Sequence, residues 1–310
     1  MLLPLYASIL VAVLFYVLIP VLGAFRTHRR WRIFRSRLVE LSRAGQLDEV
    51  VSVGGGASQG GAIPVRFIGD IEGIEGSGRI WLRGERATAV VDLGKAPFHI
   101  LADEGGGQSF FGRNSFVKSL PWQRVRMVPE GTKLYAGGLL RFEGGTPVIY
   151  GTAKERLIAL SWTGDEESLL ERAIAGGRKE NEYWSPLSRA SLGLGLGLQG
   201  ILLLLIWTDA FPSVRYLSFL VGLSPILCLL PPGLPFFFLY LRSWRAGLRA
   251  RILRDTSSLP DTPGHSGEGR GALARDASRR AFLSLAAAGF FLALDLGVNI
   301  VAAFWIRVTL

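Results

Sequence analysis

One carboxylate lies deep in the apolar segment 281–306, at Asp295, and Asn299 follows it by one helical turn. At the centre of a membrane helix an ionised carboxylate costs about 2.5–3.5 kcal/mol on insertion scales, and such residues usually face protein or water. Protonation is the simplest relief of this cost. The pair therefore has two interpretations: a proton or cation site in a small transporter, or an interhelical hydrogen-bond anchor within one chain or between protomers. We favour the anchor, because the apolar segments hold no second formal charge and show no inverted repeat.

Small residues near this pair predict close contacts between membrane helices, since glycine and alanine let two backbones approach. A stripe on the last apolar segment lies about 160° from the carboxylate around the helix. The second apolar run contains a pair of small residues four positions apart, which offers a complementary groove. A side-chain amide follows this pair within the predicted membrane span. The stripe is Gly289, Ala293 and Gly297, the groove is Gly193 and Gly197, and the amide is Gln199.

No other constellation has the parts that chemistry requires. The Gly-rich stretch 54–61 lacks the lysine of a phosphate-binding loop, and no HExxH or G-x-S-x-G motif occurs. His28, His99 and His265 are far apart in the sequence, and Cys228 is the only cysteine, which leaves no disulfide framework or cysteine-based metal site. We therefore expect no catalytic residue, no metal and no cofactor.

Four apolar runs have the length of a membrane-spanning helix, which is about 20 residues. Three are comfortably long enough, whereas the second is at the short end. The first has no basic residue before it and arginines after it, which is typical of an uncleaved anchor rather than a signal peptide. The runs are Leu2–Ala24, Ala190–Trp207, Tyr216–Leu241 and Ala281–Ile306.

Basic residues gather beside these runs and predict the orientation. Segment 26–37 holds six arginines and no acid, and segment 242–280 holds nine arginines against four acids, whereas 38–189 is nearly balanced. We expect the protein to lie in the inner (plasma) membrane of the cell. Because positively charged flanks favour the cytoplasmic side, residues 25–189 and 242–280 are expected in the cytoplasm and the N-terminus outside. The first cluster is expected to bind anionic lipid headgroups, and no nucleic-acid partner is expected. That cluster is Arg26, Arg29, Arg30, Arg32, Arg35 and Arg37.

Between the first two runs the pattern changes from helix to strand. Segment 26–45 has apolar residues at helical spacing among its arginines and predicts an amphipathic helix along the headgroups. Residues 46–62 read as a Gly-rich linker, and from Ile63 onward two hairpins are predicted, with loops at Gly84–Arg86 and Glu143–Gly145. Gly137-Gly138 suggests a bulge or sharp bend, and 105–115 a loop.

A strand at 97–103 and a terminal helix complete this region. Thr163 and Glu166 form a capping box, and Gly176-Gly177 predicts the helix end. The fold class is thus an α+β membrane protein with four transmembrane helices and a small, barrel-like, β-rich cytoplasmic domain. The domains are 1–25 (first span), 26–45 (amphipathic helix), 46–62 (linker), 63–185 (β-rich domain), 186–241 (second and third spans), 242–280 (basic loop) and 281–310 (fourth span).

Three stretches, "KAPFHILAD", "RMVPEGTKLYAGGLLR" and "GDEESLLERAI", resemble the membrane-associated β domain of the GIDE (or BAM) family. That domain lies between two membrane spans in MULAN-type ubiquitin ligases and also occurs in bacterial proteins. The resemblance covers about residues 63–208. The ligases carry a RING finger of Cys and His zinc ligands, and a chain with one cysteine is not expected to share their activity.

The expected function is therefore a non-enzymatic anchor or scaffold. It would present a cytoplasmic β-rich domain to an unknown protein partner, with its spans in the lipid bilayer and available as a homo-oligomer interface. The alternative is a transporter or channel component that uses Asp295 and Asn299. A third class, an enzyme acting at the membrane surface through the β-rich domain, is the least favoured.

Overall fold

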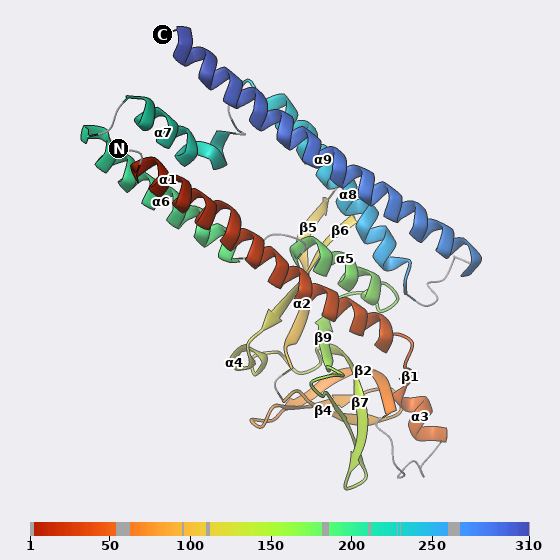
Figure 1. The fold of residues 1–310 in the computed structure, drawn as a ribbon. Coiled ribbons are helices and arrows are strands. Elements are labelled where there is room, and N and C mark those ends of the chain that lie inside the picture. The colour runs from red at the N-terminus through yellow and green to blue at the C-terminus, as the bar shows by residue number, and fades with distance from the viewer. Residues whose placement is uncertain are drawn as a thin grey trace. The chain divides into compact units, whose positions relative to one another are not determined.

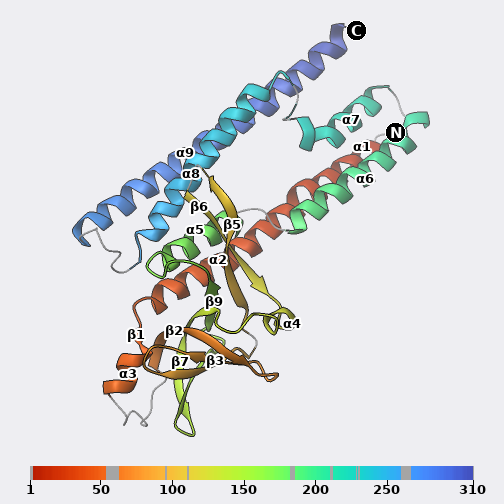
Figure 2. The same ribbon diagram turned by 180° about the vertical axis from the view of Figure 1, so that it is seen from behind.

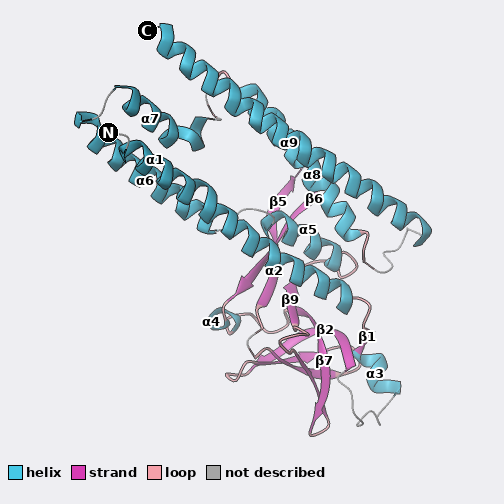
Figure 3. Cartoon of the chain, in the orientation of Figure 1, coloured by secondary structure: helices cyan, strands magenta, loops and turns pink. Residues whose placement is uncertain are grey.

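The computed structural model describes residues 3–53, 63–94, 96–109, 112–181, 186–209, 212–227, 229, 231–259 and 267–309. Of the predicted linker 46–62, residues 54–62 lie outside them, whereas residues 46–53 form the end of a short strand, β1 (Gly45–Gln46), and a helix, α3 (Leu47–Val53), rather than a linker. The chain forms two compact units: unit 1 comprises Met1–Arg29, Asn181–Arg254 and Ala272–Leu310, and unit 2 comprises Arg30–Glu180 and Asp255–Gly271. Figures 1, 2 and 3 show that helices dominate the first unit and strands the second.

Unit 1 consists of long apolar helices. The first runs without a break through α1 (Leu3–Ala12), a π-helical stretch (Val13–Leu18) and the start of α2 (Ile19–Leu41). The others are α6 (Pro186–Asp209), α7 (Pro212–Leu227), α8 (Leu234–Thr256) and α9 (Gly267–Thr309). In the described part of the chain, three helices are long and apolar enough to cross a membrane: Leu5–Leu41, Leu187–Leu205 and Gly271–Trp305. The chain is thus a membrane protein by helix length and composition.

The third predicted span, Tyr216–Leu241, is not one helix. It is divided into α7 and α8 by turns at Leu229 and at Pro231–Gly233. Consecutive prolines cannot donate backbone hydrogen bonds and their rings clash with the preceding turn, so a helix cannot pass through them. Pro235 falls in the first turn of α8, where a missing N–H costs nothing. The prediction of four continuous transmembrane helices is therefore not confirmed.

Two other predicted segments belong to long helices. The basic loop 242–280 is largely the end of α8 and the start of α9. The predicted amphipathic helix is the continuation of α2, and its apolar residues Trp31, Leu38 and Leu41 are buried in a core cluster of unit 2. Burial against unit 2 rather than contact with headgroups therefore accounts for the apolar face of this segment.

The centre of unit 2 is a closed five-stranded barrel with strand order β2-β3-β4-β8-β7, in which β7 also pairs with β2. Pairing is antiparallel except between β4 and β8, which run parallel. Valine, leucine, isoleucine and phenylalanine side chains that alternate along the strands fill its core. The strands are β2 (Ile63–Ile74), β3 (Arg79–Arg83), β4 (Thr88–Asp92), β7 (Lys133–Glu143) and β8 (Thr146–Tyr150).

Both predicted hairpins are present, since β3 pairs with β4 and β7 with β8. The second has a two-residue turn, Gly144-Gly145, rather than the predicted three residues, and both glycines have positive φ as a type I′ turn requires. The predicted bulge at Gly137-Gly138 does not occur: these residues pair in register with β2, and the irregularity lies in β2 between Ile71 and Gly73. The alternative, a sharp bend, stays a prediction at the point where the second partner of β7 changes from β9 to β8. A Cβ at Gly137 would lie 2.8 Å from Leu41, so close packing explains this glycine.

Three further strands and a helix extend the barrel. β9 (Ile158–Trp162) pairs with β7 and with β5 (Phe98–Ser109), and β5 pairs with β6 (Gly112–Leu120). The predicted strand 97–103 is confirmed, but the predicted loop 105–115 is wrong, because the backbone continues as the two arms of a hairpin. The shorter elements are β1 (Gly45–Gln46), α3 (Leu47–Val53) and α4 (Trp122–Val125).

The terminal helix α5 spans Leu169–Asn181 and packs with α2 in the second core cluster. It begins after Thr163 and Glu166, which therefore do not form the predicted capping box at its first turn. It continues through Gly176-Gly177, where the sequence predicts its end. A Cβ at Gly177 would overlap the indole ring of Trp31, which is 3% exposed. The glycine thus serves helix packing rather than helix termination.

Candidate functional site

A fully buried carboxyl group and its amide neighbour join α9 to the start of α8. Asp295 is 0% exposed and Asn299 2% exposed, and both lie on one face of α9. The Gly233 N–H donates to Asn299 Oδ1 at 3.2 Å, and Asn299 Nδ2 donates to Asp295 Oδ1 at 3.0 Å. Asp295 Oδ2 has no hydrogen-bond partner among the described residues. We call Asp295, Asn299 and Gly233 the polar triad.

Gly233 is the member that sequence reasoning missed, although the adjacent prolines signal a break there. A Cβ built on this residue would overlap the side chains of Asp295 and Asn299 and would lie 2.8 Å from the Asp295 backbone oxygen. Only glycine fits between the break and α9. Because α8 begins at the next residue, the triad lies at a helix N-terminus, where backbone N–H groups without a partner in the helix need an acceptor such as the Asn299 oxygen.

Gln199 is buried but does not belong to the triad. Its Nε2 donates to the backbone oxygen of Ser218 in α7 at 3.3 Å, and its side chain packs on Gly222. Around the same contact, Tyr16 donates to the Gly222 oxygen at 3.4 Å. The amide therefore holds α6 and α7 together, as an interhelical anchor does.

The small-residue stripes are not brought together in the described structure. A Cβ built at Gly193, Gly197, Gly289 or Gly297 meets no heavy atom within 4 Å. The close glycine contact of α6 is instead at Gly195, which packs on Phe15 and Tyr16. A role of the stripes, and of Ala293 between two of them, in a homo-oligomer stays a prediction.

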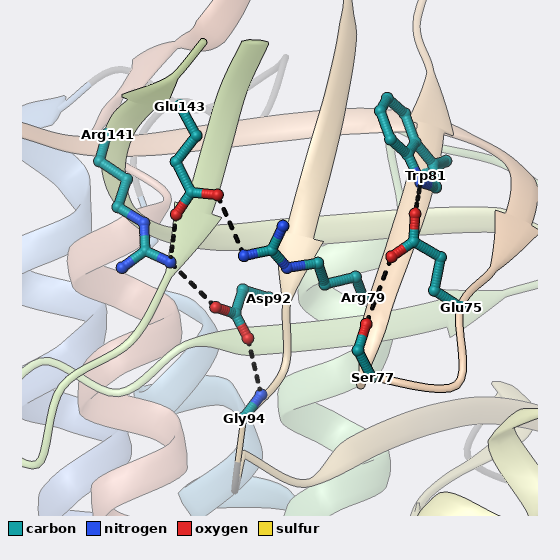
Figure 4. A network of polar contacts seen from close by, with 8 residues as sticks. All are labelled: Glu75, Ser77, Arg79, Trp81, Asp92, Gly94, Arg141 and Glu143. Carbon is teal, nitrogen blue, oxygen red and sulfur yellow. Dashed lines mark hydrogen bonds and ion pairs between the residues drawn. The ribbon is translucent and has the colours of Figure 1, made fainter.

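A second polar cluster lies on the outer face of the barrel (Figure 4). Arg141 Nη2 lies 3.0 Å from Asp92 Oδ2 and 2.7 Å from Glu143 Oε1, and Arg79 Nη2 lies 3.0 Å from Glu143 Oε2. The Arg141 guanidinium also lies 4.7 Å from the centre of the Tyr150 ring. Ion pairs and the ring thus fix four charged side chains whose exposures lie between 26% and 39%.

A separate set of contacts holds an aromatic residue of β3, Trp81, two positions from Arg79 and therefore on the same face of the strand (Figure 4). Trp81 Nε1 donates to Glu75 Oε1 at 2.6 Å, and Ser77 donates to the other oxygen of the same carboxylate at 3.3 Å. The Gly94 N–H, at 3.2 Å, fixes Asp92 in the same way. We call the side chains of Glu75, Arg79, Trp81, Asp92, Arg141, Glu143 and Tyr150 the barrel face. Its two arginines and three acids nearly balance, so it has no strong field for a phosphate or a metal ion.

Two of the six arginines predicted to meet lipid headgroups contact protein in unit 2. Arg35 pairs with Asp255, which is 2% exposed and also pairs with Arg178 at 3.1 Å. Arg37 is 6% exposed and donates to the Arg156 oxygen at 3.0 Å. For Arg26, Arg29, Arg30 and Arg32, headgroup binding stays a prediction. The buried Asp255 network was missed because its members are up to 220 residues apart.

His99 is a structural residue rather than a base or ligand. Its ring packs edge-on against Phe34, with 4.8 Å between the ring centres. Burial lowers the pKa of His99 to about 4, so the imidazole is neutral at physiological pH. Burial likewise raises the pKa of Tyr135. Among the described residues no three His, Cys, Asp or Glu side chains gather as metal ligands.

Comparison of the chain with protein-family models, with curated proteins and with solved structures finds no match. The resemblance of residues 63–208 to the GIDE domain accordingly stays a prediction. Function must be argued from the two polar clusters and from the fold that holds them.

Proposed function

We propose that this protein is a membrane-anchored scaffold whose barrel face binds a protein partner. The observation that supports it is the preorganised barrel face, in which Arg79, Arg141, Trp81 and Tyr150 are partly exposed and held by fixed contacts. Arginine, tryptophan and tyrosine are the residues most enriched at the energetic centres of protein interfaces. Side chains already fixed in place lose little conformational entropy on binding.

The charge balance of the barrel face favours a protein over a nucleic acid. Five-stranded barrels of the OB type bind oligonucleotides or oligosaccharides on one face, but an oligonucleotide site needs an excess of positive charge. A protein partner with both acidic and basic side chains could pair with the alternating arginines and carboxylates of the barrel face. These charge pairs would then set the orientation of the partner. The barrel would belong to the GIDE type and lie on the cytoplasmic side, as the arginine clusters predict.

Photo-crosslinking in intact cells tests this proposal. A photoreactive amino acid at Arg83, whose side chain is 69% exposed beside the barrel face, should give one adduct of discrete mass. Arg141→Glu should reduce that adduct at least tenfold, because it breaks two ion pairs and reverses the charge. The matched control Lys154→Glu reverses an exposed charge that belongs to the loop after β8 and not to the barrel face, and it should leave the adduct intact. An adduct insensitive to Arg141→Glu would refute a role for this surface.

Orientation is tested separately. A cysteine in place of the exposed Lys154, in a Cys228→Ser background, should resist an impermeant thiol reagent in intact cells and react after lysis. Labelling of intact cells would place the barrel outside and exclude a cytoplasmic partner.

Transport is a second candidate, favoured by one observation: the break between α7 and α8 faces Asp295. Broken helices at membrane depth form substrate and ion sites in many transporters. Asp295→Asn retains hydrogen bonding but removes the titratable group. It should abolish coupled transport in vesicles and leave scaffold crosslinking unchanged.

A further inference from the structure

We infer that the polar triad is a proton-binding site in which Asp295 Oδ2 carries the proton. The inference requires only that α9 crosses a bilayer, and it holds whether the helices anchor the barrel or move a solute. It rests on the direction of the hydrogen bonds in the triad.

The direction is fixed from one end. The Gly233 N–H can only donate, so the Asn299 side-chain atom facing it is the carbonyl oxygen. The other end of the same amide, Nδ2, is a donor and faces Asp295 Oδ1 at 3.0 Å. Oδ1 is therefore the acceptor oxygen of the carboxyl group. A proton on Oδ1 would point at the N–H of the Asn299 amide, so Oδ2 is the side-chain oxygen of Asp295 that can carry a proton without this conflict.

The surroundings of Oδ2 disfavour a bare charge. Asp295 is 0% exposed, and among the described residues it makes no ion pair and Oδ2 has no hydrogen-bond partner. An uncompensated buried carboxylate is among the most costly groups in a folded protein, and a bilayer adds to that cost. Binding a proton removes the charge while the hydrogen bond at Oδ1 is kept.

No described charge on the packed elements competes for this role. After Gly233, the first charged residue of α8 is Arg242, and the nearest acid or base before Asp295 on α9 is Arg280. At about 1.5 Å rise per residue both are more than about 10 Å along their helices. Beyond Asp295, the next charged residue of α9 is Arg307, 12 positions further on. On α7, the charged residue is Arg215, beside Tyr216, and the Tyr216 hydroxyl donates to the backbone oxygen of Ala303, eight positions beyond Asp295.

The donor set fits a proton better than a metal ion. A hard cation needs about six oxygens, often several carboxylates. The side chains of the triad supply three oxygens, but the Asn299 oxygen accepts from Gly233 and Asp295 Oδ1 accepts from Asn299. Asp295 Oδ2 is the side-chain oxygen that is left to bind a cation. Release of the proton would leave a charge beside the start of α8, so proton binding is linked to the contact between α8 and α9.

Infrared spectroscopy of the full-length protein in lipid vesicles tests the inference. At neutral pH, wild type should show the C=O stretch of a protonated carboxyl group that is absent from Asp295→Asn. The band should disappear as the pH is raised far enough to remove the proton. Absence of any such band in the wild-type minus Asp295→Asn difference would overturn the inference.

Asn299→Leu tests which oxygen carries the proton. Loss of the donor to Oδ1 should move the C=O stretch to higher frequency, since a carbonyl that accepts a hydrogen bond absorbs at lower frequency. Asn299→Ala is a second variant if the leucine prevents folding. The control Gly297→Ala, on the same helix with open space around its Cβ, should leave the band unmoved. An unshifted band in both Asn299 variants would refute the assignment to Oδ2.

Discussion

Replacement of Gly177 by alanine tests the packing of α5 on α2, because two opposing effects act at this residue. Alanine in place of glycine within a helix contributes about 1 kcal/mol of stability. The new Cβ would, however, overlap the Trp31 ring, with the ring atom Cη2 at 2.7 Å and Cε3 at 3.1 Å. Trp31 is 3% exposed and lies in a packed cluster, so its ring has little room to move.

Overpacking of a filled core costs about 1–3 kcal/mol and occasionally more. The overlap here is with the body of a rigid ring, which places the cost at the upper end of that range. The net effect of Gly177→Ala should therefore be a loss of about 1–2 kcal/mol, which is roughly 2–8 °C in the unfolding temperature of a unit of this size. Thermal unfolding of the full-length protein in detergent, followed by tryptophan fluorescence, measures it.

Gly271→Ala is the matched control, since this glycine is also helical, belongs to unit 2 and has open space around its Cβ. It should raise the unfolding temperature or leave it unchanged. In a Trp31→Leu background the ring is absent, so Gly177→Ala should then cost little, and a double-mutant cycle should give a coupling of about 1 kcal/mol or more. Equal effects of Gly177→Ala and Gly271→Ala, or no coupling, would refute the packing argument.

Three further predictions concern unit 2. Asp255→Asn should destabilise it by about 3–5 kcal/mol, because two arginines lose their buried carboxylate; thermal unfolding measures the loss. The low pKa of His99, about 4, means that the unfolded chain binds a proton first as pH falls through about 6.5. The free energy of unfolding is therefore not reduced by His99 above that pH, and it is lower by about 2 kcal/mol at about pH 5. Denaturant titrations of wild type and His99→Gln at both pH values measure this difference. Gly138→Ala should cost about 1–3 kcal/mol, since its Cβ would lie 2.6 Å from the Tyr150 oxygen.

Each of these has an outcome that contradicts it. Asp255→Asn as stable as wild type would mean that the ion pairs contribute nothing. The same acid sensitivity in wild type and His99→Gln would assign the pH dependence to other groups. Gly73→Ala is the control for Gly138→Ala because it too lies in a strand, and its Cβ meets no atom within 4 Å; equal losses in the two variants would point to strand propensity rather than to barrel closure.

Local patterns in the sequence were sufficient for elements whose cause is local. Alternation of apolar and polar residues around short Gly-containing turns predicted both hairpins, because side chains of a strand point alternately to two faces. Apolar length predicted the membrane helices wherever no two adjacent prolines intervened, as Pro231 and Pro232 do in the third run. The Asp295–Asn299 pair was predictable as well, because residues four apart on a helix lie on one face.

Glycines were misread where their cause lay in another element. Gly177 and Gly137 have the local signature of a helix end and of a bulge, yet both are small because side chains of α2 approach them. The two Asp255 ion pairs join residues 220 and 77 positions apart, and the contact of Gly233 with Asn299 joins residues 66 positions apart.

The sequence by itself thus determined the periodic elements, the membrane character and the lone intramembrane carboxylate. Only the tertiary structure decided what covers that carboxylate, which glycines are packing sites and which arginines pair with acids. The physical reason is that the type of an element follows from its local backbone preferences and hydrophobic periodicity. Which residues contact each other depends instead on which surfaces, far apart in the sequence, are buried against one another in the folded protein.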